Sequence, residues 1–193
     1  MSTTYTRASQ QVCDPTQHFD MVNHKILIRK LHWFGMRGLA GNWFSSYLSN
    51  RKQVVQIDQV KSNYANITHG VPQGSTLGPV LFLLYINDLP VNLPDAKTVL
   101  FADDTNIIFH NIEKNCLQVK INETLIKLEQ WLANNGLKLN TNKTVYMCFN
   151  QQYIQDPIQV LLNNTIIQEV KDTKFLTWGK CVQCLIEKLS HLC

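Results

Sequence analysis

The stretch TVLFADDTNIIF, residues 98–109, places two adjacent aspartates between two apolar runs. Leu100 and Phe101 precede the acids, and Ile107 and Ile108 follow them closely. Aromatic and β-branched residues on both sides predict two short strands. The run ADD between them predicts a tight β-hairpin with acidic residues at its tip.

The chemistry of this hairpin depends on Asp103 and Asp104. Carboxylates packed beside a core repel one another and lose hydration, and a divalent cation offsets that cost. Hard oxygen ligands favour Mg²⁺, which completes its octahedron with water and substrate phosphates. The alternative is an ordinary Asp–Asp β-turn that is exposed to solvent, because aspartate is common in turns.

A second informative stretch is HGVPQGSTLGPVLFLLYINDL, residues 69–89. A Gly/Pro-rich loop lets the backbone approach a ligand closely, and the helix that follows favours negative charge at its N-terminus. Pro79 suits the first turn of that helix, and its apolar residues predict burial on nearly every side. The alternative is an ordinary connection between a strand and a helix.

The rest of the chain predicts an α+β protein. An amphipathic helix over residues 24–35 ends at Gly35, and a second helix covers residues 39–50. Residues 51–60 and 64–71 predict two strands joined by residues 61–63. The chain alternates strands and helices without a βαβ regularity, so α+β fits better than a doubly wound fold.

The clearest helix lies near residue 125 and is followed by further strands. Apolar residues recur there at helical spacing, and Gly136 sits where a C-terminal cap belongs. Residues 145–149 predict a strand, and residues 158–170 predict a hairpin that turns at Asn163 and Asn164. Residues 1–11 are polar and receive no assignment. The apolar stripe of the helix is Leu117, Ile121, Leu125, Leu128 and Leu132.

Composition bounds the function only loosely. The chain of 193 residues is 45% hydrophobic and carries a formal net charge of +4, which permits a polyanionic partner without demanding one. Its longest apolar run, residues 80–86, is too short to span a bilayer, and the N-terminus is polar. We therefore expect an intracellular protein with no membrane partner and with six reduced cysteines.

Four segments, in order, resemble the boxes of reverse transcriptases from non-LTR retrotransposons, most closely the jockey-like insect type. FADD, residues 101–104, resembles the Y/F-A-D-D box, and residues 70–90 resemble the box that shapes the template and nucleotide pocket. DPTQHFDMVNHKIL, residues 14–27, resembles the first catalytic box. NNGLKLNTNKTVYMCF, residues 134–149, resembles the box that ends in a Lys-Thr pair before a strand.

The resemblance implies an RNA-directed DNA polymerase that extends a DNA primer on an RNA template with deoxynucleoside triphosphates and two Mg²⁺ ions. Asp14 and Asp103 would bind the two ions, and Asp104 would support them. One ion would activate the primer 3′-hydroxyl, and the other would hold the triphosphate. The implied fold is a palm-like antiparallel sheet with helices packed on one face.

The same resemblance assigns the nucleotide pocket. Phe19 would stack under the incoming sugar and exclude a 2′-hydroxyl, although it could also be a core residue. Gln73 and Gly74 would touch the nucleotide and the template. Lys143 would be a donor near the leaving phosphates, although it could equally be a solvated loop cation.

Several departures from the family pattern concern activity more than fold. Gln17 and His18 replace the usual Lys-Ala, Pro15 cannot donate a hydrogen bond to a sheet, and Thr177 stands where glycine is expected. We expect residues 12–176 to form the palm-like domain, residues 177–193 to be degenerate, and the fingers and thumb to be incomplete. A catalytically inactive retrotransposon remnant that at most binds nucleic acid, and an unrelated interaction domain, remain as alternatives.

Overall fold

The computed structural model describes residues 2–9, 20–72, 74–101, 104–111, 114–149, 158–162 and 165–170. The chain divides into two compact units, which are described separately. Unit 1 comprises Met1–Gln11, Leu89–Trp131 and Lys138–Cys193, and unit 2 comprises Val12–Asp88 and Leu132–Leu137.

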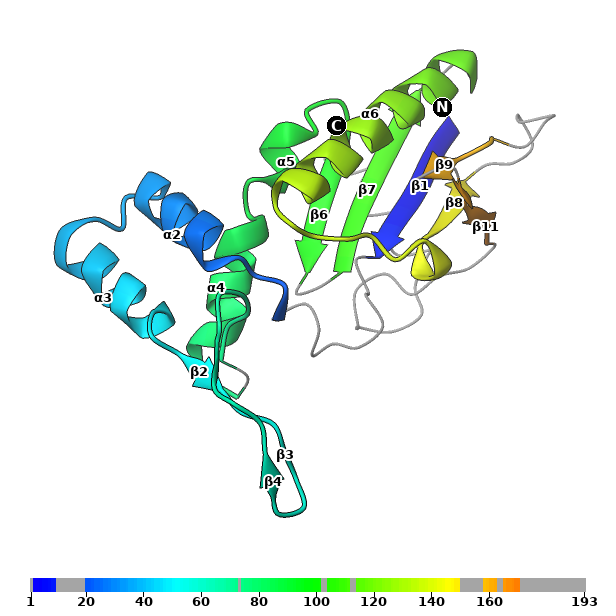
Figure 1. The fold of residues 1–193 in the computed structure, drawn as a ribbon. Coiled ribbons are helices and arrows are strands. Elements are labelled where there is room, and N and C mark those ends of the chain that lie inside the picture. Colours follow the sequence, from blue (N-terminus) through cyan, green and yellow to red (C-terminus); the bar gives the residue numbers. More distant parts are fainter. Residues whose placement is uncertain are drawn as a thin grey trace. The chain divides into compact units, whose positions relative to one another are not determined.

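Unit 1 is built on a five-stranded sheet with the strand order β11-β8-β1-β7-β6 (Figure 1). All neighbours are antiparallel except β11 and β8, which run parallel at one edge. The predicted antiparallel sheet is therefore present, with one parallel edge strand. Its strands are β1 (Ser2–Ser9), β6 (Lys97–Phe101), β7 (Asp104–Asn111), β8 (Val145–Phe149) and β11 (Gln168–Glu169).

The central strand β1 lies in the segment to which the sequence assigned no element. It pairs with β7 from Ser2↔Asn111 to Ser9↔Asp104, and with β8 on its other side. The only local signal for a strand is the run TTYT, because threonine and tyrosine favour the pleated backbone. The segment lacks the apolar alternation from which strands are usually predicted.

The predicted acidic hairpin is confirmed in its strands. β6 and β7 are antiparallel, and Phe101 pairs with Asp104, so two residues connect the strands. Ile107 and Phe109 of β7 are fully buried, as the apolar run predicted. The two connecting residues, Ala102 and Asp103, lie outside the described part of the chain.

Helix α6 (Lys114–Asn134) lies across one face of this sheet (Figure 1), and the short α5 (Leu89–Asn92) precedes β6. Gly136 has φ +64°, and its N–H donates to the carbonyl of Ala133 at 3.0 Å, which confirms the predicted C-terminal cap. The predicted apolar stripe is buried at every position: Leu117, Ile121, Leu125, Leu128 and Leu132 are at most 4% exposed.

The last described segment of unit 1 packs against β8. β9 (Leu161–Leu162) and β10 (Thr165–Ile166) form the hairpin predicted to turn at residues 163 and 164. Tyr146 of β8 is 4% exposed, and its hydroxyl donates to the carbonyl of Ile158 at 2.7 Å. This bond ties the segment before β9 to the sheet.

Unit 2 contains the helices α2 (His24–Trp33), α3 (Gly38–Leu48) and α4 (Leu77–Ile86), all three of which the sequence predicted. Asn23 caps α2, because its side chain accepts from the N–H groups of Lys25 and Ile26 at 3.0 and 3.2 Å. Asn23 is the residue with the extended backbone that a cap requires.

Helix α4 is tied to α2 and to the turn after α6. Lys30 of α2 donates to the Tyr85 carbonyl and to the Asp88 carboxylate, both at 2.6 Å. Burial lowers the pKa of Lys30, and the hydrogen bond to Asp88 opposes that shift. The Tyr85 hydroxyl donates to the buried Asn135 carbonyl at 2.6 Å. The predicted burial of this helix is confirmed for Leu81, Phe82, Tyr85 and Ile86.

The predicted hairpin of unit 2 exists, but its turn lies elsewhere. β2 (Lys52–Gln53) pairs with β5 (Ala65–Asn66), and β3 (Gln56–Ile57) pairs with β4 (Val60–Lys61). The chain therefore reverses at residues 58–59, not at residues 61–63. Asp58 has φ +52°, a left-handed conformation that aspartate tolerates better than most residues.

Removal of the Tyr85 hydroxyl should destabilise unit 2. In Tyr85→Phe the Asn135 carbonyl loses its donor and the Asn23 N–H loses an acceptor at 3.4 Å. We expect the free energy of unfolding in urea to fall by about 1–3 kcal/mol. Tyr47→Phe is the control, because that hydroxyl has no hydrogen-bond partner among the described residues. Equal stability of the two variants would contradict the role of this bond.

Stability at alkaline pH should depend on Tyr146. Burial of its ring, with Glu169 nearby, raises the pKa of Tyr146 to about 12. The folded state therefore keeps the phenol proton to higher pH than the unfolded state, whose pKa is about 10. The stabilisation that comes from this raised pKa is fully present below about pH 10, and it is lost as the pH rises toward 12.

We expect the free energy of unfolding to fall between pH 10 and 12, and to fall less steeply in Tyr146→Phe. Tyr64→Phe should keep the wild-type dependence, because Tyr64 is 75% exposed. Urea titrations at several pH values measure this. Identical pH profiles for wild type and Tyr146→Phe would show that another group causes the loss.

Candidate functional site

Asp104 lies at the end of the sheet where three strands begin or end. It is the first residue of β7, and it pairs with Ser9 at the end of β1 and with Phe101 at the end of β6. Asp104 is 9% exposed. This burial argues against a fully solvent-exposed turn for this carboxylate, the alternative that the sequence left open.

The residues after Asp104 are also polar and buried. Thr105 is 3% exposed and Asn106 is 1% exposed, although both lie in the second strand from the edge of the sheet. The Thr105 hydroxyl has no hydrogen-bond partner among the described residues. Buried polar groups cost stability unless they are paired. The Thr105 hydroxyl therefore costs stability at this end of the sheet.

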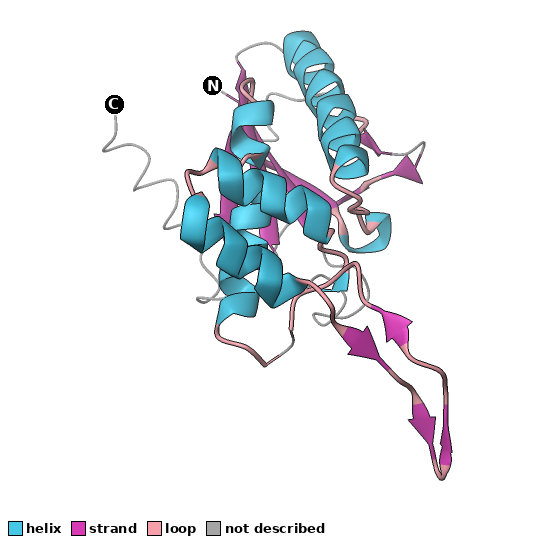
Figure 2. Ribbon diagram, turned by 60° about the vertical axis from the view of Figure 1, so that its left-hand side comes forward, coloured by secondary structure: helices cyan, strands magenta, loops and turns pink. Residues whose placement is uncertain are grey.

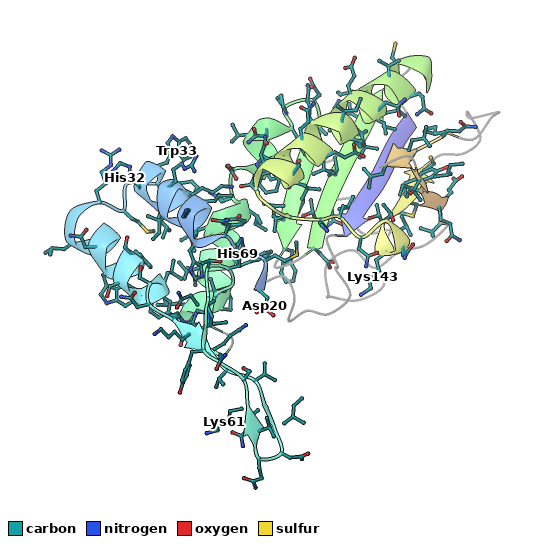
Figure 3. All side chains as sticks on the ribbon, viewed as in Figure 1. Asp20, His32, Trp33, Lys61, His69 and Lys143 are labelled. Carbon is teal, nitrogen blue, oxygen red and sulfur yellow. The ribbon has the colours of Figure 1, made fainter. Side chains whose placement is uncertain are left out.

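Lys143 approaches the same end of the sheet. It is the last residue of the 3-10 turn η1 (Thr141–Lys143), and it is exposed (Figure 3). β8 begins two residues later at Val145, whose partner on β1 is Arg7. Because β1 and β8 are antiparallel, the start of β8 lies beside the end of β1, where Asp104 also pairs. The fold of unit 1 thus brings two predicted site residues, Asp104 and Lys143, to one sheet end.

The Gly/Pro-rich loop belongs to unit 2 and has a defined local shape. Gly74 has φ +75°, a backbone conformation that L residues rarely adopt. The Ser75 hydroxyl donates to the Pro72 carbonyl at 2.9 Å and accepts from the Gly78 N–H at 3.0 Å. A Cβ atom on Gly78 would lie 3.0 Å from the Pro72 oxygen, so the loop closes tightly on the start of α4.

A cavity of about 500 Å³ opens within unit 2 between the start of α2, the root of the hairpin and this loop. Its first and last residues in the chain, Asp20 and Pro72, directly follow and precede the predicted nucleotide-binding residues Phe19 and Gln73. The lining residues are Asp20, Arg51, Gln53, Asn66, Ile67, Thr68, His69, Gly70, Val71 and Pro72.

One wall of this cavity is held by a short polar network. The His69 ring contacts the Asn23 side chain at 3.1 Å and the Thr68 hydroxyl at 2.9 Å. The His24 ring donates to the Gly70 carbonyl at 2.6 Å. Sequence reasoning missed Arg51 and His69 as cavity residues, because Arg51 lies in no recognised motif and His69 only begins the Gly/Pro-rich stretch. Figure 3 shows Asp20 and His69, both of which line this cavity.

Four predicted site residues, Asp14, Phe19, Gln73 and Asp103, lie outside the described part of the chain. Gly74 belongs to unit 2, whereas Asp104 and Lys143 belong to unit 1. The predictions that Asp14 and Asp103 bind the two ions, and that Gln73 and Gly74 contact the nucleotide and the template, therefore stay predictions. The described residues alone contain no group of three His, Cys, Asp or Glu that could hold a metal ion. Within that same part of the chain, no helix has the length and apolar character needed to cross a membrane.

Solved structures with a similar fold are telomerases. Apo telomerase from Candida tropicalis matches with a TM-score of 0.56 at 16% identity, over 77% of this chain and 31% of that one. Telomerase from Candida albicans in complex with a fragment of telomeric RNA matches with a TM-score of 0.55 at 14% identity. That match covers 100% of this chain and 35% of the other. These similarities show that the chain shares a fold with these telomerases.

Sequence relatives specify the family. Residues 8–179 match the family described as reverse transcriptase (RNA-dependent DNA polymerase), and the chain belongs to that family. The RNA-directed DNA polymerase from mobile element jockey of Drosophila melanogaster is 31% identical over 138 residues, 68% of this chain. The probable RNA-directed DNA polymerase from transposon BS of the same species is 30% identical over 173 residues, 84% of this chain. The matched segments span 15% and 19% of these two relatives.

The conformation of the Gly74 loop generates a stability prediction. Apart from its chain neighbours, no atom of the described residues lies within 4 Å of a Cβ built on Gly74, so a side chain there meets mainly the strain of positive φ. We expect Gly74→Ala to lower the free energy of unfolding by about 1–2 kcal/mol. Gly74→Asn should cost less, because asparagine tolerates this conformation. Urea denaturation distinguishes the two, and equal costs would rule out backbone strain as the reason for glycine.

Proposed function

We propose that this chain is the palm-centred core of the RNA-directed DNA polymerase of a non-LTR retrotransposon. It would extend a DNA primer on an RNA template with deoxynucleoside triphosphates. Family membership over residues 8–179 supports the reaction class. The palm-like domain expected over residues 12–176 would also include the central strand β1, and residues 177–193 would be a degenerate segment.

The observation that carries the proposal is the buried Asp104 at the shared end of β1, β6 and β7. Asp103 directly precedes it in the chain, and Asp14 follows the end of β1 by five residues. A carboxylate held at the edge of a packed sheet is poorly hydrated. It therefore binds a neutralising cation more tightly than a fully hydrated carboxylate does. Asp14 and Asp103 would be the principal ligands, and Asp104 would support them.

The donor set fits Mg²⁺, because three carboxylates supply hard oxygen ligands and leave positions for phosphate oxygens. Two bound ions would activate the primer 3′-hydroxyl and stabilise the leaving pyrophosphate. The protein's own part in phosphoryl transfer is mainly positioning and charge stabilisation. Lys143, exposed at the same sheet end as Asp104, would donate a proton to the leaving phosphates.

The nucleotide would be held by residues around the loop and cavity of unit 2. Gly74 gives the backbone a shape that allows close approach to a base or sugar. Gln73 would contact the nucleotide and the template, and Phe19 would exclude a 2′-hydroxyl by stacking under the sugar. Arg51 and His69 line the neighbouring cavity with hydrogen-bond donors for phosphate or base oxygens.

A second candidate is a catalytically inactive member of the family that at most binds nucleic acid. The observations that favour it are Pro15, Gln17 and His18 in the first box, where the family commonly has other residues. Pro15 directly follows a proposed metal ligand and removes a backbone donor there. Small displacements of this kind matter, because in-line transfer depends on the placement of the reacting groups.

Metal binding should depend on the acidic hairpin. We expect Mn²⁺, followed by electron paramagnetic resonance as a substitute for Mg²⁺, to bind the wild-type chain. Binding should be lost in Asp103→Asn and weakened in Asp104→Asn. Asp95→Asn is the matched control, because that exposed aspartate of unit 1 pairs with Lys127 at 2.6 Å. Mn²⁺ binding that survives in Asp103→Asn would refute the proposed metal site.

Primer extension separates the two candidates. The chain is mixed with a DNA primer on an RNA template, deoxynucleoside triphosphates and Mg²⁺. We expect weak extension that falls at least about a hundredfold in Asp103→Ala, since the metal clamp supplies most of the stabilisation of the transition state. Metal binding without any extension would favour the inactive candidate. Extension unaffected by Asp103→Ala would contradict the assigned catalytic residue.

A further inference from the structure

The positive charge of the chain is concentrated in one segment. Residues 20–88 contain seven Lys or Arg and three Asp, which gives +4. The whole chain has 18 Lys or Arg and 14 Asp or Glu, so eleven of each remain outside this segment. The net charge of +4 is therefore located in residues 20–88, and the rest of the chain is balanced.

Most of these cations are not neutralised by neighbouring acids. Lys30 is paired with Asp88 at 2.6 Å. The other six have no ion-pair partner among the residues that the structure describes: Lys25, Arg29, Arg37, Arg51, Lys52 and Lys61. Three of these six lie in residues 51–67, which we call the arm. An unpaired group of cations attracts a polyanion, and its effect falls as salt rises.

The arm is a two-stranded ribbon without a core of its own. Every residue from 52 to 66 is exposed. Figure 2 shows the arm as a hairpin with two successive pairs of short strands. Its hydrogen bonds are internal: the Ser62 N–H donates to the Val55 carbonyl at 2.9 Å, and the Val55 N–H donates to the Ser62 hydroxyl at 3.0 Å. An isolated two-stranded hairpin is only marginally stable in water, so a partner would stabilise it.

The strand register gives the arm two different faces. Gln56 pairs with Lys61 in the β3–β4 pair, so these two residues share one face of that pair. Lys52 belongs to the β2–β5 pair at the root of the arm, and all three residues are exposed. The opposite face carries Ile57 and its partner Val60, with Val55 two residues away, and these are 59–74% exposed. Figure 3 shows Lys61 on the arm.

We propose that the exposed basic side chains of the arm, Lys52 and Lys61, with Gln56 beside Lys61, bind the phosphodiester backbone of the nucleic acid on which the chain acts. The inference rests on the proposed function, because that function supplies the polyanion. Lys52 lies in the strand pair at the root of the arm and Lys61 in the outer pair, so the two lysines would contact separate phosphates without reading sequence.

The root of the arm also forms part of the cavity of unit 2. Its root residues Arg51, Gln53 and Asn66 line the 500 Å³ cavity that adjoins Phe19 and Gln73 in the chain. A strand held at that cavity could continue along the arm within the same unit. The charge favours nucleic acid over a protein partner, because three cations and one acid, Asp58, give residues 51–67 a net charge of +2.

The test uses the full 193-residue chain and a fluorescein-labelled RNA–DNA hybrid, with anisotropy measured at several KCl concentrations. We expect Lys52→Ala/Lys61→Ala to weaken binding about tenfold and to lower the slope of log K against log salt by about two. The matched control is Lys97→Ala/Lys138→Ala, which removes two exposed lysines of unit 1. This control should keep the wild-type affinity within about twofold.

A second measurement is independent of affinity. Lysine acylation followed by mass spectrometry should show Lys52 and Lys61 protected when the hybrid is bound, and Lys97 and Lys138 unprotected. Circular dichroism and urea midpoints should be unchanged in both double variants, because all four side chains are exposed. Protection confined to the two arm lysines would support the proposal directly.

Three outcomes would overturn the proposal. If wild type binds the hybrid and Lys52→Ala/Lys61→Ala binds it equally, the arm is not a contact, while the proposed polymerase function stands. If Ile57→Ser/Val60→Ser rather than the lysine variant reduces binding or self-association, the arm is a protein surface. If wild type binds no hybrid, both the arm contact and the nucleic-acid partner of the proposed function are wrong.

Discussion

The pairing of β1 with β7 on one side and β8 on the other holds the sheet of unit 1 together. Without β1, the strands would separate into the β6–β7 hairpin and the β8–β11 pair, and two-stranded pieces are marginal in water. The register of β1 also determines that Ser9 lies beside Asp104. A slip of one residue would turn every side chain of the strand to the other face.

This register has a chemical consequence at one end of the sheet. β1 and β6 end there, β7 and β8 begin there, and Asp104 and Lys143 reach it from different parts of the chain. The polar run of Asp104, Thr105 and Asn106 is buried at that end. The burial of apolar side chains further along β7 and in the stripe of α6 stabilises unit 1 and offsets the free-energy cost of burying this polar run.

Unit 2 is held together by different interactions from those in the sheet of unit 1. Its helices are joined by specific polar bonds, such as the Lys30 contacts with α4 and the Tyr85–Asn135 bond, while the arm carries its exposed cations away from any core. The well-packed loop around Gly78 and the coreless arm lie on either side of one cavity. In unit 2 the loop thus has a defined backbone shape, and the arm carries the exposed positive charge.

The sequence by itself determined the elements whose signals are local: the buried stripe of α6, the cap at Gly136, the strands around the acidic doublet and the family that its boxes resemble. Only tertiary structure decided that the polar segment of β1 is the central strand, because its place is set by backbone pairing with β7 and β8 and not by a local apolar pattern. The turn at Asp58 and the cavity residues Arg51 and His69 were missed for the same reason: strand register and distant neighbours, not local composition, place them.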